Sequence, residues 1–193
     1  MSDFIASDIA ATDLSNARTL ALAGRHGGSG AAALTPAAPA TRLSLRAKPD
    51  AVSALSAALG VSLPTKPKTS ASLNGRHALW LGPDEWLVID ETEADLMAAV
   101  ASSGVLHSAT DVSHRNTAIL VKGFGAETAI NGGCPQDLSL ATFPVGACAR
   151  TVFAKSEIVL LRTAQDAFRV ECWRSFAPYV FGLLSEAAED AGN

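Results

Sequence analysis

Cys134 and His114 are the two residues of this sequence whose types could form a catalytic pair. Cys134 lies in the stretch GGCPQD, and His114 is the nearest histidine before it. A thiol becomes a nucleophile when a neighbouring base deprotonates it, so the pair is the minimal set for a cysteine hydrolase. One cysteine with one histidine is a non-specific signal. We favour a small buried residue at a tight turn, and keep the hydrolase as the weaker alternative.

His107 and His114 are the residues to test for a metal site. Zinc needs three or more ligands around one centre, and the sequence has no C-x-x-C, H-x-x-x-H or H-E-x-x-H pattern. We therefore expect no metal site. Asp111 in TDVSHRN is typical of a side chain that stabilises a turn, while Arg115 could pair with Asp111 or with a carboxylate of a partner.

Strands and helices alternate along the chain from residue 41 onwards. Residues 41–47 alternate as a strand, 48–60 predict a helix closed by glycine, 77–90 a hairpin, and 92–104 a helix capped by Thr92. This β-α-β-β-α order is typical of a ferredoxin-like unit. The second half repeats it loosely, with predicted strands at 116–123, 147–154, 157–163 and 167–173, and helices at 125–133 and 174–190. The sequence thus predicts an α+β fold of two ferredoxin-like half-domains with antiparallel sheets, 41–110 and 111–193.

Residues 1–40 differ from the body in composition. They are rich in Ala, Gly, Ser and Pro and show no apolar period, which predicts a flexible or partner-draped arm. The stretch GRHGGSG has neither the Walker spacing nor G-x-G-x-x-G, so we interpret it as a glycine-rich linker and not as a phosphate loop.

The hairpin LWLGPDEWLVID, residues 79–90, has two apolar faces. Pro83 and Asp84 predict a tight turn. If Leu81 pairs with Trp86, then Trp80, Leu87 and Ile89 share the second face. A strand pair exposed to water on one side would alternate apolar and polar residues, so something must cover that face. We expect the second half-domain or a partner protein to do so.

Composition excludes several classes of function. The 193 residues carry a net charge of −4, with no run of Lys or Arg, which argues against binding nucleic acid or anionic membranes. Charged residues make up 18%, against roughly 25% in typical domains, so part of the surface is expected to be covered by another protein. We find no membrane-spanning run and no signal peptide, and the three cysteines fit reduced thiols. These features predict a cytoplasmic protein.

Several long motifs, taken together, resemble one protein family. They are ALWLGPDEWLV at 78–88, DVSHRNTAILVKG at 111–123, GGCPQDL at 132–138, FPVGACART at 143–151 and RSFAPYVFGLL at 174–184. In this order they resemble the gamma subunit of heterotetrameric sarcosine oxidase, over about residues 41–190. The segment DVSHRNTAILVKGFGAETAI is also similar to the folate-binding domain of the glycine-cleavage T-protein.

The resemblance implies a setting for the chain. Sarcosine oxidases of this kind contain alpha, beta, gamma and delta subunits and convert sarcosine to glycine, hydrogen peroxide and either formaldehyde or methylene-tetrahydrofolate. FAD, FMN, NAD, zinc and tetrahydrofolate are implied for the partner subunits, none for the gamma chain, which packs on the alpha subunit. No catalytic, cofactor-binding or metal residue is expected here. The candidate partner contacts are Trp80, Trp86, Leu87, Ile89, His114, Arg115 and Trp173.

The resemblance to the T-protein leaves an alternative function, a free-standing folate-binding aminomethyl or methyl transferase. That enzyme uses a carboxylate in the strand pair after the resembling helix. The corresponding region here, FPVGACARTVFAKSEIVLLR, contains Glu157 as its one acid, at a position where a turn is expected. This difference argues against folate catalysis by the chain.

Overall fold

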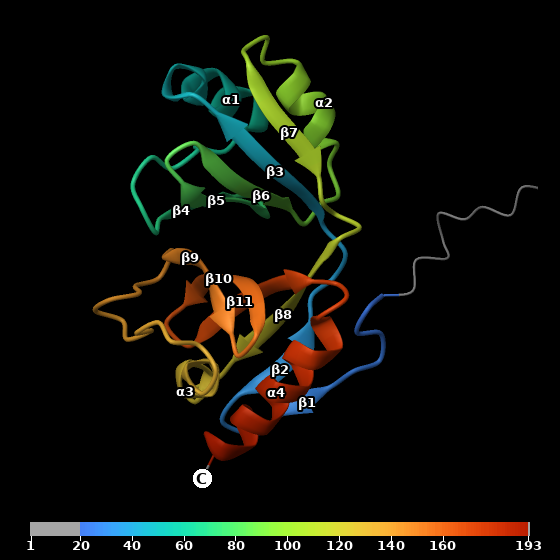
Figure 1. Ribbon diagram of the computed structural model, residues 1–193, viewed down its shortest axis with the longest axis vertical. Coiled ribbons are helices and arrows are strands. Elements are labelled where there is room, and N and C mark those ends of the chain that lie inside the picture. The colour runs from blue at the N-terminus through green and yellow to red at the C-terminus, as the bar shows by residue number, and fades with distance from the viewer. Residues whose placement is uncertain (1–19, 193) are drawn as a thin grey trace, which may run out of the picture.

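Two antiparallel sheets pack face to face, with helices covering their outer faces (Figure 1). The computed structural model describes residues 20–192. The first lobe contains α1 (Val52–Leu59), α2 (Leu96–Ala101) and strands β3 (Thr41–Ala47), β4 (Ser70–Leu73), β5 (Arg76–Gly82), β6 (Glu85–Asp90) and β7 (His107–Asp111). The second lobe contains α3 (Ala126–Asn131), α4 (Ala177–Asp190) and strands β1 (Gly27–Gly28), β2 (Ala33–Pro36), β8 (Asn116–Lys122), β9 (Cys148–Phe153), β10 (Ser156–Ala164) and β11 (Ala167–Trp173).

The first lobe has the ferredoxin-like topology that the sequence predicts. Its sheet order is β4-β5-β6-β3-β7, in which β3, β5, β6 and β7 take the places of the four ferredoxin-like strands. Pro49 begins the short 3-10 turn Pro49–Ala51 that leads into α1, and Gly60 ends that helix with a φ of 64°. Leu55 and Leu59 point from α1 into the core against the sheet. The helix α2 begins later than predicted, because Asp95 and not Thr92 caps it by accepting a hydrogen bond from the Ala98 backbone at 2.9 Å.

The second lobe repeats this order with one exchange. Its sheet runs β9-β10-β11-β8-β2-β1 when read from the matching edge, so β2 takes the place that β7 has in the first lobe. The strand β2 pairs antiparallel with β8, with Leu34 opposite Val121. The last strand of the second ferredoxin-like unit therefore comes from the N-terminal side of the first lobe, and not from the chain after α4.

The flexible-arm prediction is wrong for residues 27–36. Leu34 is buried in the outer core of the second lobe, and Ser29 donates a hydrogen bond from its hydroxyl to the Ala188 carbonyl of α4 at 2.6 Å. The glycines serve the turn before β2, because a Cβ on Gly28 would lie 2.0 Å from the Ala32 carbonyl oxygen. The glycine-rich stretch is thus a tight turn against α4 and not a linker. Residues 1–19 of the predicted arm lie outside the described residues.

The hairpin turn forms where predicted, but its register differs. Gly82 pairs with Glu85 across Pro83 and Asp84, while Trp80, not Leu81, pairs with Trp86, because the register shifts between Trp80 and Gly82. As a result both tryptophans face the helices of the first lobe. The opposite face carries Leu79, Leu87 and Ile89, which pack against the second lobe in the layer between the sheets. We call this layer the seam.

The two-faced hairpin is explained by its position in the middle of four layers. Its outer face is covered by α1 and α2, and its inner face by β9 and β10 of the second lobe (Figure 1). Of the two coverings proposed for the inner face, the second half-domain is the one found. The apolar part of the seam is formed by Ala40, Leu79, Leu81, Leu87, Ile89, Val112, Cys148, Val159 and Leu161.

Candidate functional site

The seam has an apolar region, described above, and a second region that contains charged side chains. Arg42 of β3 and Glu171 of β11 form a bidentate pair, with Nε–Oε2 at 2.6 Å and Nη2–Oε1 at 3.2 Å. Arg169, on the same face of β11, donates from Nε to Glu171 at 2.7 Å and from Nη1 to Glu91 at 2.6 Å. Three of these side chains are nearly inaccessible, with 3%, 1% and 2% of Arg42, Glu171 and Arg169 exposed. We call these four residues the seam network.

The seam network joins the lobes by charge. Arg42 and Glu91 belong to the first lobe, whereas Arg169 and Glu171 belong to the second. Burying ions costs several kcal/mol each, so a buried carboxylate between two guanidinium groups holds its position only while both remain. Among the described residues, Nη2 of Arg169 is buried without a hydrogen-bond partner. The polar residues of β11 thus serve to dock one sheet on the other.

Asp90 organises the end of β6 by a separate set of bonds. Its Oδ2 accepts from Arg76 Nε at 2.6 Å, and its Oδ1 accepts from the Thr92 hydroxyl at 2.6 Å and from the Ala94 backbone at 3.1 Å. Burial by itself would raise the pKa of Asp90, but the hydrogen bonds from Thr92, Ala94 and Arg76 outweigh it and lower the pKa to about 2. This carboxylate is therefore ionised and structural, and fixes the loop that leads to α2.

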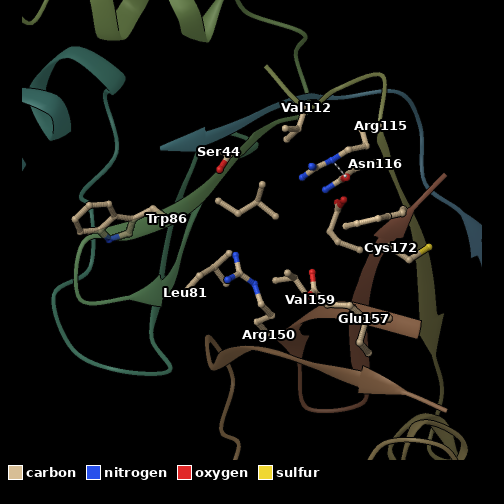
Figure 2. A pocket seen from close by; sticks show the side chains of 14 residues that line it. Ser44, Leu81, Trp86, Val112, Arg115, Asn116, Arg150, Glu157, Val159 and Cys172 are labelled. Atoms are coloured by element: carbon tan, nitrogen blue, oxygen red, sulfur yellow. Dashed lines mark hydrogen bonds between the residues drawn. The ribbon is translucent and has the colours of Figure 1, made fainter. Parts of the chain in front are cut away.

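A small cavity lies at the polar side of the seam (Figure 2). Its lining includes Ser44, Arg115, Asn116, Glu157 and Trp173. The internal volume is about 40 Å³. That space holds one or a few waters, whereas ligand sites typically occupy about 300–1,000 Å³. Glu157, the one acid of the region compared with the T-protein, is exposed and faces this cavity. The cavity is too small to receive a folate.

A wider groove of about 700 Å³ runs beside the two segments that connect the lobes. Ala37–Ala40 and Leu22 supply apolar lining, while Glu93, Asp111 and His114 lie at the groove as exposed side chains. Asp111 Oδ1 accepts a hydrogen bond from the Ser113 backbone at 2.8 Å, as expected of a turn-stabilising residue. Both acids of the groove, Glu93 and Asp111, have exposed side chains.

The structure does not bring Cys134 and His114 together. Cys134 lies in the outer core of the second lobe, where its sulfur is 3.9 Å from the Thr151 hydroxyl, whereas His114 lines the groove. The other two thiols are also buried, and burial raises the pKa of both Cys148 and Cys172 to about 12. A thiol with such a pKa is a poor nucleophile at neutral pH. The cysteine-hydrolase alternative therefore has no supporting geometry.

Three of the predicted partner contacts are wrong because they are buried inside the chain. Trp86, Leu87 and Ile89 are 1%, 4% and 0% exposed. The misplaced register and the internal covering of the hairpin explain the error. Trp80 is half-buried against the core of the first lobe, and its indole nitrogen is buried without a hydrogen-bond partner within residues 20–192.

The remaining three predicted contacts lie on the surface and close together. His114 and Arg115 are exposed, and the Arg115 guanidinium carbon lies 5.2 Å from the centre of the Trp173 ring. Two further aromatic side chains, Phe176 and Tyr179, are 45% and 42% exposed in the same stretch. Sequence reasoning assigned both to a helix and not to a contact. Their spacing from Trp173, three and six residues, is the signal that was available.

No group of three or more His, Cys, Asp or Glu side chains among residues 20–192 is arranged to hold a metal ion. The helices in this part of the chain also include none with the length and apolar character needed to cross a bilayer.

Comparison with protein families decides the relationship of the chain. The model of the sarcosine oxidase gamma subunit family matches residues 44–190. The chain belongs to this family. The resemblance seen in the motifs is thereby confirmed, over nearly all of the region from which it was inferred.

Individual gamma subunits are similar along most of their length. The sarcosine oxidase subunit gamma of Corynebacterium sp. strain U-96 is 30% identical over 170 residues, covering 84% of this chain and 82% of that protein. The corresponding subunit of an Arthrobacter species is 32% identical over 146 residues, covering 73% and 72%. These two matches thus cover between 72% and 84% of the chains compared.

Solved structures support the same relationship. A chain of the heterotetrameric sarcosine oxidase from Corynebacterium sp. U-96, determined in complex with pyrrole 2-carboxylate, has a TM-score of 0.80 at 28% identity, with 93% of each chain covered. Aminomethyltransferase T of the glycine cleavage system from Bartonella henselae has a TM-score of 0.57 at 17% identity, covering 80% of this chain and 45% of that one. The latter shows a shared fold, and the predicted α+β class is confirmed.

Proposed function

We propose that this chain is the non-catalytic gamma subunit of a heterotetrameric sarcosine oxidase. The complex would demethylate sarcosine oxidatively to glycine and hydrogen peroxide, with formaldehyde or methylene-tetrahydrofolate as the one-carbon product. The observation that carries the proposal is the match over 93% of both chains with a chain of a heterotetrameric sarcosine oxidase. The gamma chain would bind the alpha subunit directly, with beta and delta in the same complex.

The chemistry of the complex would belong to its other subunits. FAD, FMN, NAD, zinc and tetrahydrofolate are assigned to them in this proposal, and the gamma chain braces the alpha subunit. This division is supported by the surroundings of the residues whose types could take part in catalysis. Glu171 and Asp90 are each bound to an arginine, and the three cysteines are buried. We place the complex in the cytoplasm, where three unpaired thiols would stay reduced.

The decisive experiment is reconstitution of the complex with and without this chain. The four subunits are coexpressed with a tag on alpha, and the purified material is tested for subunit composition and for sarcosine-dependent hydrogen peroxide release. We expect this chain in a stoichiometric amount, and loss of yield or stability of the alpha subunit when it is omitted. An untagged chain that never copurifies with alpha would contradict the proposal.

The transferase alternative makes a different prediction for the isolated chain. A free-standing transferase would bind tetrahydrofolate as a monomer, which isothermal titration calorimetry measures directly. We expect no binding in the cavity of the seam, which is too small for the ligand, and folate bound in the wider groove of about 700 Å³ is the result that would favour the transferase. Since the hairpin is covered on both faces within the chain, the isolated chain should be soluble enough for this measurement.

A further inference from the structure

We propose that the gamma chain binds the large subunit through an exposed cluster of Arg115, Trp173, Phe176 and Tyr179, and that the surface docked there presents a carboxylate to Arg115 beside an apolar pocket for the rings. We call these four residues the aromatic cluster. The inference rests on the proposed function, because it supposes that a large partner exists, and adds which surface binds it and by what chemistry.

The cluster is built from three separate elements. Arg115 precedes β8, Trp173 ends β11, and Phe176 and Tyr179 belong to the start of α4. The rings of Trp173 and Phe176 lie with centroids 6.2 Å apart and tilted by 47°, while the Arg115 guanidinium carbon lies 5.2 Å from the centre of the Trp173 ring. Tyr179 follows Phe176 by three residues, which places it on the same side of the helix. Trp173 and Tyr179 are held by a strand and a helix, and Arg115 and Phe176 lie in the turns directly before β8 and α4, so the backbone that carries the cluster is ordered before a partner binds.

The aromatic side chains of the cluster are exposed to solvent and do not belong to a hydrophobic core. Trp173, Phe176 and Tyr179 are 40%, 45% and 42% exposed, although each could be buried in an ordinary domain. Other exposed apolar side chains, such as Leu106 and Phe124, stand apart from the cluster in the fold. Trp, Tyr and Arg are also the residue types enriched where interfaces gain most of their energy. Together the four side chains have the composition of an interface centre.

The charge of Arg115 determines the chemistry of the occupant. Within residues 20–192, no carboxylate forms an ion pair with Arg115, whose Nε donates to the Asn116 side chain at 3.4 Å. Glu157 and Glu171 line the same small cavity, but Glu171 is bound to two arginines and Glu157 does not reach Arg115. The Arg115 guanidinium group lies over the Trp173 ring, and its Nη donors are left for a carboxylate, which a guanidinium group binds in bidentate geometry.

The partner and not a second copy is the occupant that fits best. The net charge of this chain is −4, yet the cluster carries Arg115, which forms no ion pair within residues 20–192, with exposed His114 as its neighbour in sequence. In a symmetric dimer through this patch, the cluster would meet its own image, and the two Arg115 side chains would approach one another without a carboxylate. A large subunit with an acidic residue beside an apolar pocket would complement it.

The test is competition for incorporation into the complex. Wild-type chain and a variant, distinguished by mass, are coexpressed with the alpha, beta and delta subunits, and their ratio in the purified complex is measured by mass spectrometry. We expect Arg115→Glu and Trp173→Ala each to be incorporated at least about tenfold less than wild type, as for central interface residues. Arg115→Lys keeps the positive charge but lacks the planar guanidinium group, so its incorporation should lie between that of wild type and that of Arg115→Glu.

Phe124→Ala is the matched control. Phe124 is 81% exposed and follows the opposite end of β8, so its loss should leave incorporation within about twofold of wild type. All variants are first shown by circular dichroism and thermal unfolding to be folded when isolated. Folded Arg115→Glu and Trp173→Ala chains that enter the complex as well as wild type would overturn the inference, while wild-type incorporation would leave the proposed function intact.

Two other outcomes are also decisive. A wild-type chain that fails to enter any complex would remove the proposed function and this surface with it. An isolated wild-type dimer that the Arg115→Glu substitution dissociates, measured by light scattering, would assign the aromatic cluster to a second copy of the chain and overturn the assignment to the large subunit.

Discussion

In the first lobe the outer strand beside β3 is β7, which follows α2 along the chain; in the second lobe the equivalent place beside β8 is taken by β2, from the N-terminal side of the first lobe. The two lobes therefore share a strand order and differ in connectivity. The first lobe is continuous in sequence, from Thr41 to Asp111, whereas the second needs both ends of the described chain. From this difference we expect the second lobe, and not the first, to lose its structure when the N-terminal region is removed.

The largest effect is expected from removing residues 1–36. The deletion takes away β1, β2 and the buried side chains of Leu22 and Leu34, whose burial alone is worth about 3–6 kcal/mol. We expect α4 and β8 to lose amide protection in hydrogen-exchange mass spectrometry, while α1 and β6 keep it. Deletion of residues 1–19 is the control and should leave β2 in place. Protected α4 amides in the longer deletion would refute the role given to β2.

The next effect tests whether the lobes behave as one unit. Glu171→Gln removes the carboxylate that lies between Arg42 and Arg169, and breaking a buried ion pair costs about 3–5 kcal/mol because a charge is left uncompensated. In urea unfolding we expect a lower midpoint and separate transitions for the two lobes. Glu157→Gln, an exposed neighbour at the seam, should change stability by less than about 0.5 kcal/mol. Equal effects of the two substitutions would argue against a structural seam network.

A smaller, pH-dependent effect should be confined to the first lobe. The folded pKa of Asp90 is about 2, below the value near 3.8 of an unperturbed Asp, so its contribution of about 2 kcal/mol is present above about pH 4 and lost as the pH falls through 2. We expect the free energy of unfolding to fall over this range in wild type and less steeply in Asp90→Asn, as measured by urea titrations. Parallel pH profiles would show that Asp90 is not the titrating group.

The smallest signal comes from the thiols, all three of which belong to the second lobe. In the folded chain Cys148 and Cys172 are buried with pKa values of about 12, so labelling by a disulfide reagent at pH 8 should be slow. Labelling should become fast in the chain that lacks residues 1–36, because its second lobe opens. Fast labelling of intact wild type would mean that this lobe is already open.

The parts of the fold that follow from local sequence were predictable. Pro83 and Asp84 specify the hairpin turn, and Gly60 specifies the end of α1, because both depend on the conformations of a few adjacent residues. The register within the hairpin was not predictable in this way. It depends on an irregularity between Trp80 and Gly82, which exchanges the faces of the residues before it.

The features that sequence reasoning missed depend on distant partners. In β2 the one buried large side chain is Leu34, so four residues ending in proline carry too little pattern to indicate a strand until β8 is beside them. Arg42 and Glu171 are 129 positions apart, and the residues around each of them give no sequence signal that indicates the pairing. For the candidate site, the exposure of Arg115 and Trp173 agrees with the expected surface position, and their contact with a partner stays a prediction.

The place of β2 also sets a timetable for synthesis. Roughly 85 residues separate Pro36 from the end of β8, and at about 5–20 residues per second the ribosome needs several seconds to deliver them. During that interval all of the first lobe can be synthesised, while Leu34 has left the ribosome before its partner strand β8 exists. One of the first two described strands to be translated is thus among the last to pair with its long-range partner.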